Sequence, residues 1–354
     1  MTHVFIAPHP DDVALSCGGL IASLRELGQN VTILTVFSGN GGADGLTGYQ
    51  REALGFGSKT HWPSTEAFNR EAILPDFPLT AAWVADGERL EATQEDADQA
   101  AKRFWQLSSW YRRASIHNES LAGQPVIDDL STQGAVVTDD VVDAAAAGDL
   151  MARRRIEDER YAYFAEASIV FLDLPDAVFR GYEGDEQLLG TPRTGEAPLF
   201  DLLREEIVRL EPQQLYVPLG VGGHVDHQLC RQVGVDLLAQ PRRWVMPGPE
   251  YAGMVVFYED FPYSWWNDFR SLDELGPTAL AGFPSDIGLY PTYADIGDQL
   301  ERKITGISLY ESQIERLFDD ERAMANAVRS YGAALGALGG VAGAAERYWR
   351  TSRV

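Results

Sequence analysis

Two short clusters of histidine and aspartate hold the residue types that could bind and use a metal ion. The first cluster, residues 8–12, reads PHPDD, and the second, residues 222–227, reads GGHVDH. Imidazole nitrogens and carboxylate oxygens are ligands of catalytic zinc, which takes three protein ligands and keeps one position open for water. The two clusters together therefore predict a catalytic metal site if folding brings them into contact.

His9, Asp12 and His227 supply one such set of three ligands. Asp11 is then left free beside the metal, where it could act as a general base. A bound cation lowers the pKa of its water toward ~7, so a neighbouring carboxylate can take a proton from that water. This division of roles indicates hydrolysis by metal-activated water, with Zn²⁺ preferred and another divalent metal possible.

The remaining polar residues of the second cluster complete the predicted machinery. His224 lies three residues before His227 and could act as a general acid or stabilise an oxyanion. Asp226 is expected to orient His224 through the second imidazole nitrogen. Each cluster alone is a weak signal, because an Asp-Asp pair at a helix start commonly serves as a cap. Their joint placement favours the metal site.

The elements around the clusters predict that they meet in space. Residues 3–7 predict a strand, residues 12–27 a helix and residues 31–37 a buried strand, which together form a βαβ unit. Residues 215–219 predict a strand that ends before the second cluster, and residues 226–238 predict the helix after it. Ligands bind at the carboxyl edge of parallel sheets, so both clusters are expected at that edge.

The alternation of strands and helices predicts an α/β fold with a doubly wound, Rossmann-like and mostly parallel sheet. We expect this domain to comprise residues 1–42 and 149–320. Residues 43–148 break the alternation and predict a large helical and loop insertion after the second strand. The insertion could pack on the sheet domain over the site or lie remote from the chemistry. Residues 321–354 are expected to form a C-terminal helical tail.

Composition and charge exclude several partner classes. The 354-residue chain has 29 basic and 53 acidic residues, and its formal charge of −24 would repel nucleic acid and anionic bilayers. Its two cysteines, Cys17 and Cys230, form no CxxC pair. Without an export signal or an apolar stretch of ~20 residues, we expect a cytoplasmic location. A homo-oligomer stays open.

The chain resembles the metal-dependent N-acetylglucosaminyl deacetylase superfamily, termed PIG-L-like or LmbE-like. The resemblance rests on both clusters, with supporting matches at residues 154–158, 171–176, 258–263, 303 and 310–313. It implies a zinc-dependent hydrolase that cleaves an N-acyl amide, expected to be N-acetyl, of an amino sugar or related small molecule. It also implies the same roles for the two clusters that their residue types predict.

The resemblance further implies residues that bind the substrate. Arg154 matches an arginine that often contacts substrate near the metal in relatives, and Arg153 and Arg155 are alternative equivalents. Glu259 and Asp260 follow a predicted strand and are expected at the rim of the site. The insertion matches nothing in the superfamily, so the substrate and the acyl group stay open.

Two other functions fit parts of the same pattern. His9 and Asp11 with a distant histidine could form the two-histidine, one-carboxylate triad of a non-haem Fe(II) oxygenase. That triad is usually carried on a β-barrel fold rather than on a parallel sheet. A non-catalytic sugar- or metal-binding module is the other alternative, and the presence of Asp11 beside the ligands argues against it.

Two substitutions separate the predicted base from the predicted ligands. Asp11→Ala should abolish turnover while metal stays bound, because only the proton acceptor is removed. His227→Ala should lose the metal as well as turnover. Metal content and amide hydrolysis of the purified variants check both outcomes, and near-full activity of Asp11→Ala would show that the base is another group.

Overall fold

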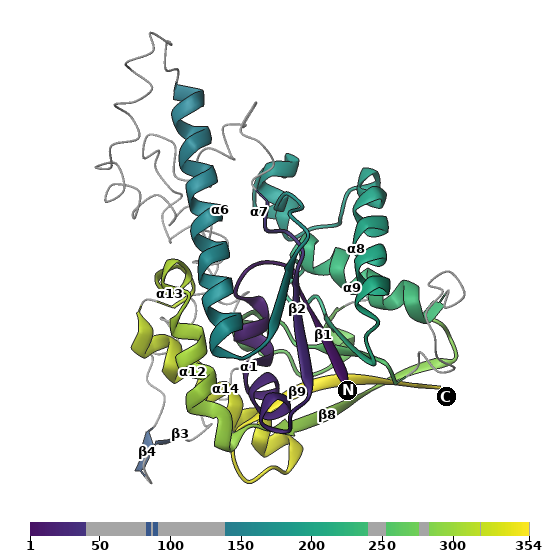
Figure 1. Cartoon of the computed structure of the whole chain (residues 1–354). Helices are drawn as coiled ribbons and strands as arrows, with labels where there is room; N and C mark the ends of the chain where they lie inside the picture. The colour runs from purple at the N-terminus through teal and green to yellow at the C-terminus, as the bar shows by residue number, and fades with distance from the viewer. Residues whose placement is uncertain are drawn as a thin grey trace.

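The computed structural model describes residues 1–39, 83–85, 88–90, 139–239, 253–275, 283–318 and 320–353. Its centre is a seven-stranded sheet in the order β5-β2-β1-β6-β7-β9-β8 (Figure 1). The strands are β1 (Thr2–Ala7), β2 (Asn30–Thr35), β5 (Ser168–Phe171), β6 (Gln214–Pro218), β7 (Val255–Tyr258), β8 (Ile287–Asp295) and β9 (Ala345–Arg353). A separate hairpin joins β3 (Trp83–Ala85) and β4 (Glu88–Leu90).

The sheet is parallel from β5 to β7 and antiparallel at one edge. β1 pairs in parallel with β2 on one side and with β6 on the other. β9 runs antiparallel to both β7 and β8. The predicted α/β fold with a mostly parallel sheet is therefore confirmed, and β1 and β6 flank the point where the strand order reverses.

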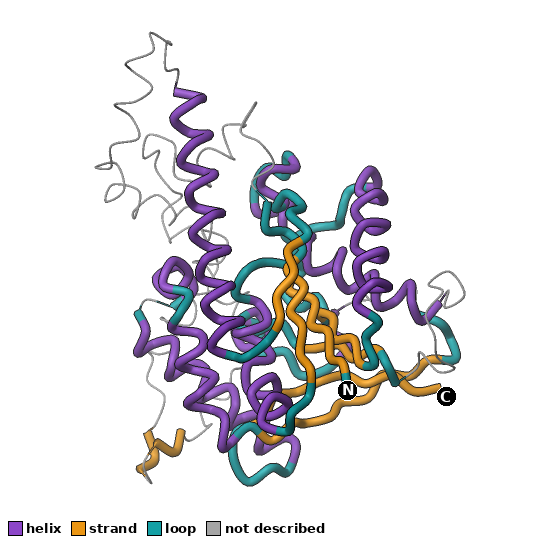
Figure 2. The backbone as a smooth tube through the Cα atoms, in the orientation of Figure 1, coloured by secondary structure: helices purple, strands orange, loops and turns teal. Residues whose placement is uncertain are grey.

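Helices cover both faces of the sheet, as Figures 1 and 2 show. On one face lie α1 (Asp12–Glu26), α6 (Asp139–Phe164), α12 (Leu300–Ser308) and α14 (Glu321–Gly339), and on the other lie α8 (Ala197–Leu210) and α9 (Val225–Ala239). The shorter helices are α7 (Asp185–Leu188), α10 (Tyr263–Trp266) and α13 (Glu311–Leu317), with 3₁₀ turns at Ala177–Arg180, Thr194–Glu196, Leu272–Leu275 and Gly297–Gln299.

The strands at the centre are apolar on both sides, as a sheet covered twice requires. In β1, Phe5 and Ala7 belong to the hydrophobic core beneath α1, whereas Val4 and Ile6 belong to the core beneath α9. All four side chains are buried. The alternation fixes the register of β1 and thereby the place where its following residues leave the sheet.

Helix α1 is tied to the sheet by one buried carboxylate. Glu346 of β9 accepts hydrogen bonds from the backbone N–H groups of Gly19 and Leu20, at 2.9 Å each. Lys303 of α12 and the hydroxyl of Tyr348 also donate to Glu346, at 2.7 Å each. The carboxylate thus links three elements and fixes the lengthwise position of α1, which begins at the first cluster.

The close approach of α1 to its neighbours requires glycine in this helix. A Cβ atom on Gly19 would lie 2.6 Å from the Cγ2 atom of Ile296, closer than van der Waals contact allows. The Cys17 side chain, from the same turn of the helix, is buried as a free thiol.

Among the helices that the structure describes, none is both long and apolar enough to cross a bilayer.

Two predicted boundaries differ from the structure. The predicted domain boundary at residue 149 falls inside α6, because the Asp/Ala-rich run from Asp139 continues without a break into the amphipathic helix that follows. The predicted C-terminal helical tail is wrong for its last part, since residues 345–353 form β9 in the main sheet. Most of the predicted insertion, residues 43–148, lies outside the described residues.

The Glu346 linkage predicts a large loss of stability on truncation. Glu346→Ala should lower the free energy of unfolding by about 3–5 kcal/mol, because it leaves the buried Lys303 ammonium without its partner. Urea unfolding of the purified protein measures this. Glu301→Ala removes the exposed Glu301–Arg329 pair and serves as the matched control, with an expected change of about 0–1 kcal/mol. Equal effects of the two substitutions would contradict the role given to Glu346.

Candidate active site

The two clusters meet at the carboxyl ends of β1 and β6. The first cluster follows the end of β1 at Ala7, and the second follows the end of β6 at Pro218. Because these strands are parallel neighbours, their following loops lie side by side at the reversal of strand order. His9 and His227 come together there, with ring centroids 5.4 Å apart.

The three predicted ligands face one another at short range. Oδ2 of Asp12 lies 3.2 Å from Nδ1 of His9 and 3.3 Å from Nε2 of His227. All three side chains are buried, and their donor atoms lie within 4.8 Å of one another. Asp11, which the oxygenase alternative would use as its carboxylate, is absent from both metal-binding groups found among the described residues.

The geometry of these atoms fits a divalent cation. Zinc lies ~2.0–2.1 Å from its nitrogen and oxygen ligands, so two corners of its tetrahedron are about 3.3 Å apart. The separations of 3.2 and 3.3 Å match that edge. In addition, Nε2 of His227 is buried without a hydrogen-bond partner, as expected for a nitrogen whose lone pair is reserved for a metal.

One carboxylate hydrogen-bonds to each of the two histidines. Nδ1 of His227 lies 2.6 Å from Oδ1 of Asp260, and Nε2 of His9 lies 3.0 Å from Oδ2 of Asp226. A carboxylate at one imidazole nitrogen fixes the tautomer and directs the lone pair of the other nitrogen toward the metal. Both predicted histidine ligands are therefore oriented by a carboxylate, as histidine ligands in metal sites commonly are.

These two carboxylates are themselves held rigidly. Asp260 accepts hydrogen bonds from the backbone N–H groups of Gly220 and Val221, at 2.7 and 2.9 Å. Asp226 accepts one from the N–H group of Ala177 at 3.0 Å and is paired with Arg180 at 2.6 Å. Sequence reasoning missed Arg180, because no motif surrounds it and its contact with residue 226 depends on tertiary packing.

Carboxylates dominate the charge around His9. Burial lowers the pKa of His9, but the carboxylates of Asp176, Asp12 and Asp226 outweigh that effect and raise it to about 10. The histidine would thus hold a proton where a ligand must be neutral. A divalent ion would take the place of that proton and compensate the same carboxylates. Asp176 is a further residue that the sequence analysis gave no role.

Asp11 has the environment of a proton acceptor. Burial raises its pKa, and Arg154 opposes that increase, leaving a value of about 8. Burial also acts to raise the pKa of Asp12. There, however, the charges of His227 and His9 outweigh burial and lower the pKa to about 2. Neighbouring carboxyls with pKa values pushed apart can divide acid–base and ligand roles.

The backbone at Asp11 is also unusual. Its φ of 107° lies in a region that non-glycine residues rarely adopt, and such strain concentrates at functional sites. The side chain is buried, and its Oδ2 atom has no hydrogen-bond partner. The strained conformation turns Asp11 away from a capping role and leaves one oxygen available for a proton.

His224 is held as a neutral imidazole. Burial and, next, the charge of His9 lower its pKa well below the ordinary value. Its Nδ1 atom accepts a hydrogen bond from the backbone N–H of Asp226 at 3.2 Å, so the proton resides on Nε2. The backbone N–H of Asp226 thus contacts His224, and the Asp226 carboxylate bonds to His9 and Arg180.

Of the three consecutive arginines at residues 153–155, Arg154 is the one that reaches the site. It is buried, donates to the carbonyl oxygen of Pro10 at 3.1 Å and lies 3.9 Å from Oδ2 of Asp11. The alternative equivalents point elsewhere, since Arg153 pairs with Glu157 and Arg155 with Asp173. The placement of Arg154 at Asp11 follows from its position on α6.

Glu259 and Asp260 do not lie where the sequence predicted substrate contacts. Asp260 backs His227, and Glu259 is buried in a pair with Arg347. Glu259 also accepts hydrogen bonds from Trp349 and Tyr331. Internal partners occupy both carboxylates. These contacts indicate that Asp260 and Glu259 position other side chains of the protein. The sequence placed both residues after the correct strand but could not give the inward direction of their side chains.

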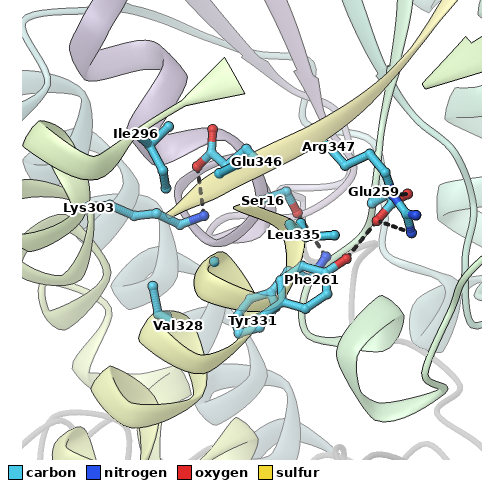
Figure 3. Close-up of a pocket in the computed structure, with 12 residues that line it drawn as sticks. Ser16, Glu259, Phe261, Ile296, Lys303, Val328, Tyr331, Leu335, Glu346 and Arg347 are labelled. Atoms are coloured by element: carbon cyan, nitrogen blue, oxygen red, sulfur yellow. Dashed lines mark hydrogen bonds and ion pairs between the residues drawn. The ribbon is translucent and has the colours of Figure 1, made fainter. Parts of the chain in front are cut away.

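A pocket near α1 lies outside this site (Figure 3). Its lining includes Ser16 and Phe261, and its charged groups are paired as Lys303–Glu346 and Arg347–Glu259. Figure 3 shows both pairs between the side chains that it labels. The pocket contains none of the three predicted ligands. It thus contributes to the packing of α14 rather than to the metal chemistry.

Comparison with known proteins identifies relatives of the chain. Residues 4–103 match the family model PIG-L, described as GlcNAc-PI de-N-acetylase. The chain is 31% identical over 317 residues to a 2'-N-acetylparomamine deacetylase of Streptomyces fradiae, covering 88% of this chain and 73% of that protein.

Solved structures share the fold. A deacetylase of the teicoplanin biosynthesis pathway, solved as a complex with bog, superposes with a TM-score of 0.57 at 15% identity, over 100% of this chain and 99% of that one. An A40926 pseudoaglycone deacetylase superposes with a TM-score of 0.53 at 18% identity, over 99% and 97% of the two chains.

The carboxylate behind His227 yields a testable prediction. Asp260→Asn should weaken metal binding by about 10–100-fold, because the amide neither stabilises the Nδ1 proton nor raises the basicity of Nε2 as a carboxylate does. Competition with a metal-binding dye measures the dissociation constant. Asp273→Asn, at an exposed surface position, is the matched control and should bind metal like the parent protein. Unchanged affinity in Asp260→Asn would rule out the orienting role.

Proposed function

The chain belongs to the PIG-L family of de-N-acetylases, and on this premise we propose that it is a zinc-dependent hydrolase that removes an N-acyl group, expected to be acetyl, from an amino sugar. The observation that carries the proposal is the convergence of His9, Asp12 and His227 at the separations of a metal tetrahedron. A free carboxylate oxygen of Asp11 beside these ligands supplies the base. A binding module would need no such group.

The donor set favours zinc among divalent ions. Two imidazole nitrogens and one carboxylate oxygen make a three-ligand catalytic site of the kind that zinc occupies. A cation held there would polarise the acyl oxygen of the substrate and lower the pKa of a water molecule. The remaining steps depend on residues of this chain.

Asp11 and His224 then carry the proton transfers and the charge. Asp11 takes a proton from the attacking water as its oxygen bonds to the acyl carbon. The Nε2–H group of His224 donates a hydrogen bond to the acyl oxygen, which gains negative charge. The C–N bond breaks when Asp11 or His224 delivers a proton to the nitrogen, and the products are a free amine and a carboxylate.

Arg154 is proposed to bind substrate as well as to hold Asp11. Its guanidinium lies 3.9 Å from Oδ2 of Asp11 and 3.9 Å from Oδ2 of Asp176. A polar substituent of a sugar that reaches Asp11 would therefore also reach this cation. Arginine suits such a contact because its planar fork presents several donors at once.

The net charge of the chain supports an amino sugar as substrate. The formal charge of −24 creates a field that attracts cations. An amino sugar with ammonium groups elsewhere in the molecule would be drawn to such a protein. The 31% identical relative acts, by its description, on 2'-N-acetylparomamine.

An amine-release assay tests the proposed function. The enzyme should release free amine from at least one member of a panel of N-acetylglucosamine derivatives and N-acetylated aminoglycosides. Removal of the metal with a chelator should abolish release, and zinc should restore it, because the metal supplies the activated water. Stoichiometric iron together with oxygen consumption would instead support the oxygenase alternative, and a fully active metal-free protein would exclude metal-dependent hydrolysis.

A further inference from the structure

Arg180 lies between two carboxylates beside the predicted metal site. Its Nη2 group donates to Oδ1 of Asp226 at 2.6 Å, and its Nε–H group donates to Oε1 of Glu196 at 2.8 Å. The third nitrogen, Nη1, donates to the carbonyl oxygen of Pro175 at 2.9 Å. All three nitrogens of the guanidinium are thus engaged, and its planar fork fixes the direction of each bond.

The carboxylate of Asp226 transmits this fixed position to His9. Its Oδ2 atom accepts a hydrogen bond from the backbone N–H of Ala177 at 3.0 Å and lies 3.0 Å from Nε2 of His9. Because Arg180 bonds to the other oxygen, the carboxylate cannot rotate without breaking one of these contacts. A rotation would also release the imidazole of His9, whose Nδ1 atom faces Asp12.

An aromatic ring makes a second connection between the guanidinium and His9. Arg180 lies over the ring of Phe37, with its central carbon 4.7 Å from the centroid. The same ring lies 6.1 Å from the ring of His9, and the two planes are tilted by 40°. Phe37 is buried. A displaced guanidinium would therefore alter the packing against His9 as well as the bond to Asp226.

Glu196 holds this guanidinium from the start of α8. The residue occupies the N-cap position of that helix, and its side chain is 10% exposed. Its Oε1 atom accepts from Arg180, while its Oε2 atom accepts from the hydroxyl of Tyr182 at 2.9 Å. The backbone N–H of Arg193 donates to that hydroxyl oxygen, also at 2.9 Å. Both oxygens of Glu196 are thus in fixed contacts.

We propose that Glu196 is a positioning residue for the metal ligand His9 and acts on it through Arg180 and Asp226. Without this carboxylate, the Nε–H group of a largely buried cation would lose its partner, which is costly. The guanidinium would then shift toward another acceptor and release the Asp226 carboxylate. The inference rests on the proposed metal-dependent function. It assigns to α8 a part in holding a ligand that precedes α1, on the opposite face of the sheet.

The substitution Glu196→Gln tests the proposal with little change in side-chain size. Glutamine removes the negative charge and offers one acceptor oxygen to the two donors of Arg180 and Tyr182. We expect the dissociation constant for zinc to rise by about 10-fold, the lower end of the range for a group that supports a metal ligand. Competition with a metal-binding dye measures it. Glu205→Gln, at an exposed position on the same helix, is the matched control and should bind zinc like the parent protein.

Tyr182→Phe separates the proposed role from a general loosening of the segment. This substitution removes the hydrogen bond to Oε2 of Glu196 but keeps the ion pair between Glu196 and Arg180. Zinc affinity should therefore equal that of the parent protein. An equal loss of affinity in Tyr182→Phe and Glu196→Gln would overturn the proposal, because loosening alone would then explain both results.

A double-mutant cycle tests the route through Asp226. Asp226→Asn alone should weaken zinc binding, and Glu196→Gln added to it should cause less than a further ~threefold loss, because residues that act through one another are not additive. A further loss of about 10-fold, as for independent sites, would overturn the proposal. Parental zinc affinity in the single variant Glu196→Gln would also overturn it.

Arg180→Lys tests the same link if Glu196→Gln does not fold. An ammonium group lacks the planar fork that bonds to both carboxylates at once, so zinc binding should again weaken. Parental affinity in Arg180→Lys would overturn the proposal. The dye measurement does not depend on turnover. A parent protein that binds zinc but releases no amine would therefore refute the proposed hydrolase and leave the positioning role standing, whereas a parent that binds no zinc would refute both.

Discussion

The parallel pairing of β1 with β6 is the constraint on which the site depends. These strands are separated by more than two hundred residues, yet their paired register brings His3 opposite Gln214 and Phe5 opposite Tyr216. Both strands then end at the same edge, and the next residues of each carry the histidines and aspartates. A shift of register by one residue would turn the buried side chains of β1 to the opposite face and move His9 away from His227.

Hydrogen bonds and ion pairs restrain the histidine side chains in the loops at this junction. Asp260 is held by two backbone N–H groups and holds His227 in turn. Arg180 is paired with Asp226, which holds His9. Each histidine is thus fixed through a carboxylate that has its own fixed partner. Such layers of support keep ligand atoms near a productive geometry before the metal arrives, which lowers the cost of binding.

The arrangement also concentrates negative charge in a buried space. Asp11, Asp12, Asp176 and Asp226 are all nearly inaccessible to solvent. Charges of one sign at such a depth are costly unless a cation compensates them. Arg154 and Arg180 compensate part of this charge. A divalent ion between His9, Asp12 and His227 would compensate the remaining negative charge. The ion that the proposed hydrolysis requires would therefore also stabilise the buried carboxylates.

The sequence predicted the parallel sheet and the two clusters well, because apolar strands followed by polar residues are local patterns. It missed β8 and β9. In β9, Glu346 and Arg347 are charged residues that are buried only because distant elements supply their partners, so no local apolar pattern marks the strand. It placed Glu259 and Asp260 at the right strand end but could not give their direction. Arg180 was missed for a similar reason, because its contact with Asp226 arises only from tertiary packing.

The most direct test of this account is the position of the metal in a crystal of the zinc-loaded protein, located by anomalous scattering at the zinc edge. We expect one strong peak within about 2.0–2.2 Å of Nδ1 of His9, a carboxylate oxygen of Asp12 and Nε2 of His227. A peak held by other residues, or no peak near these three side chains, would contradict it.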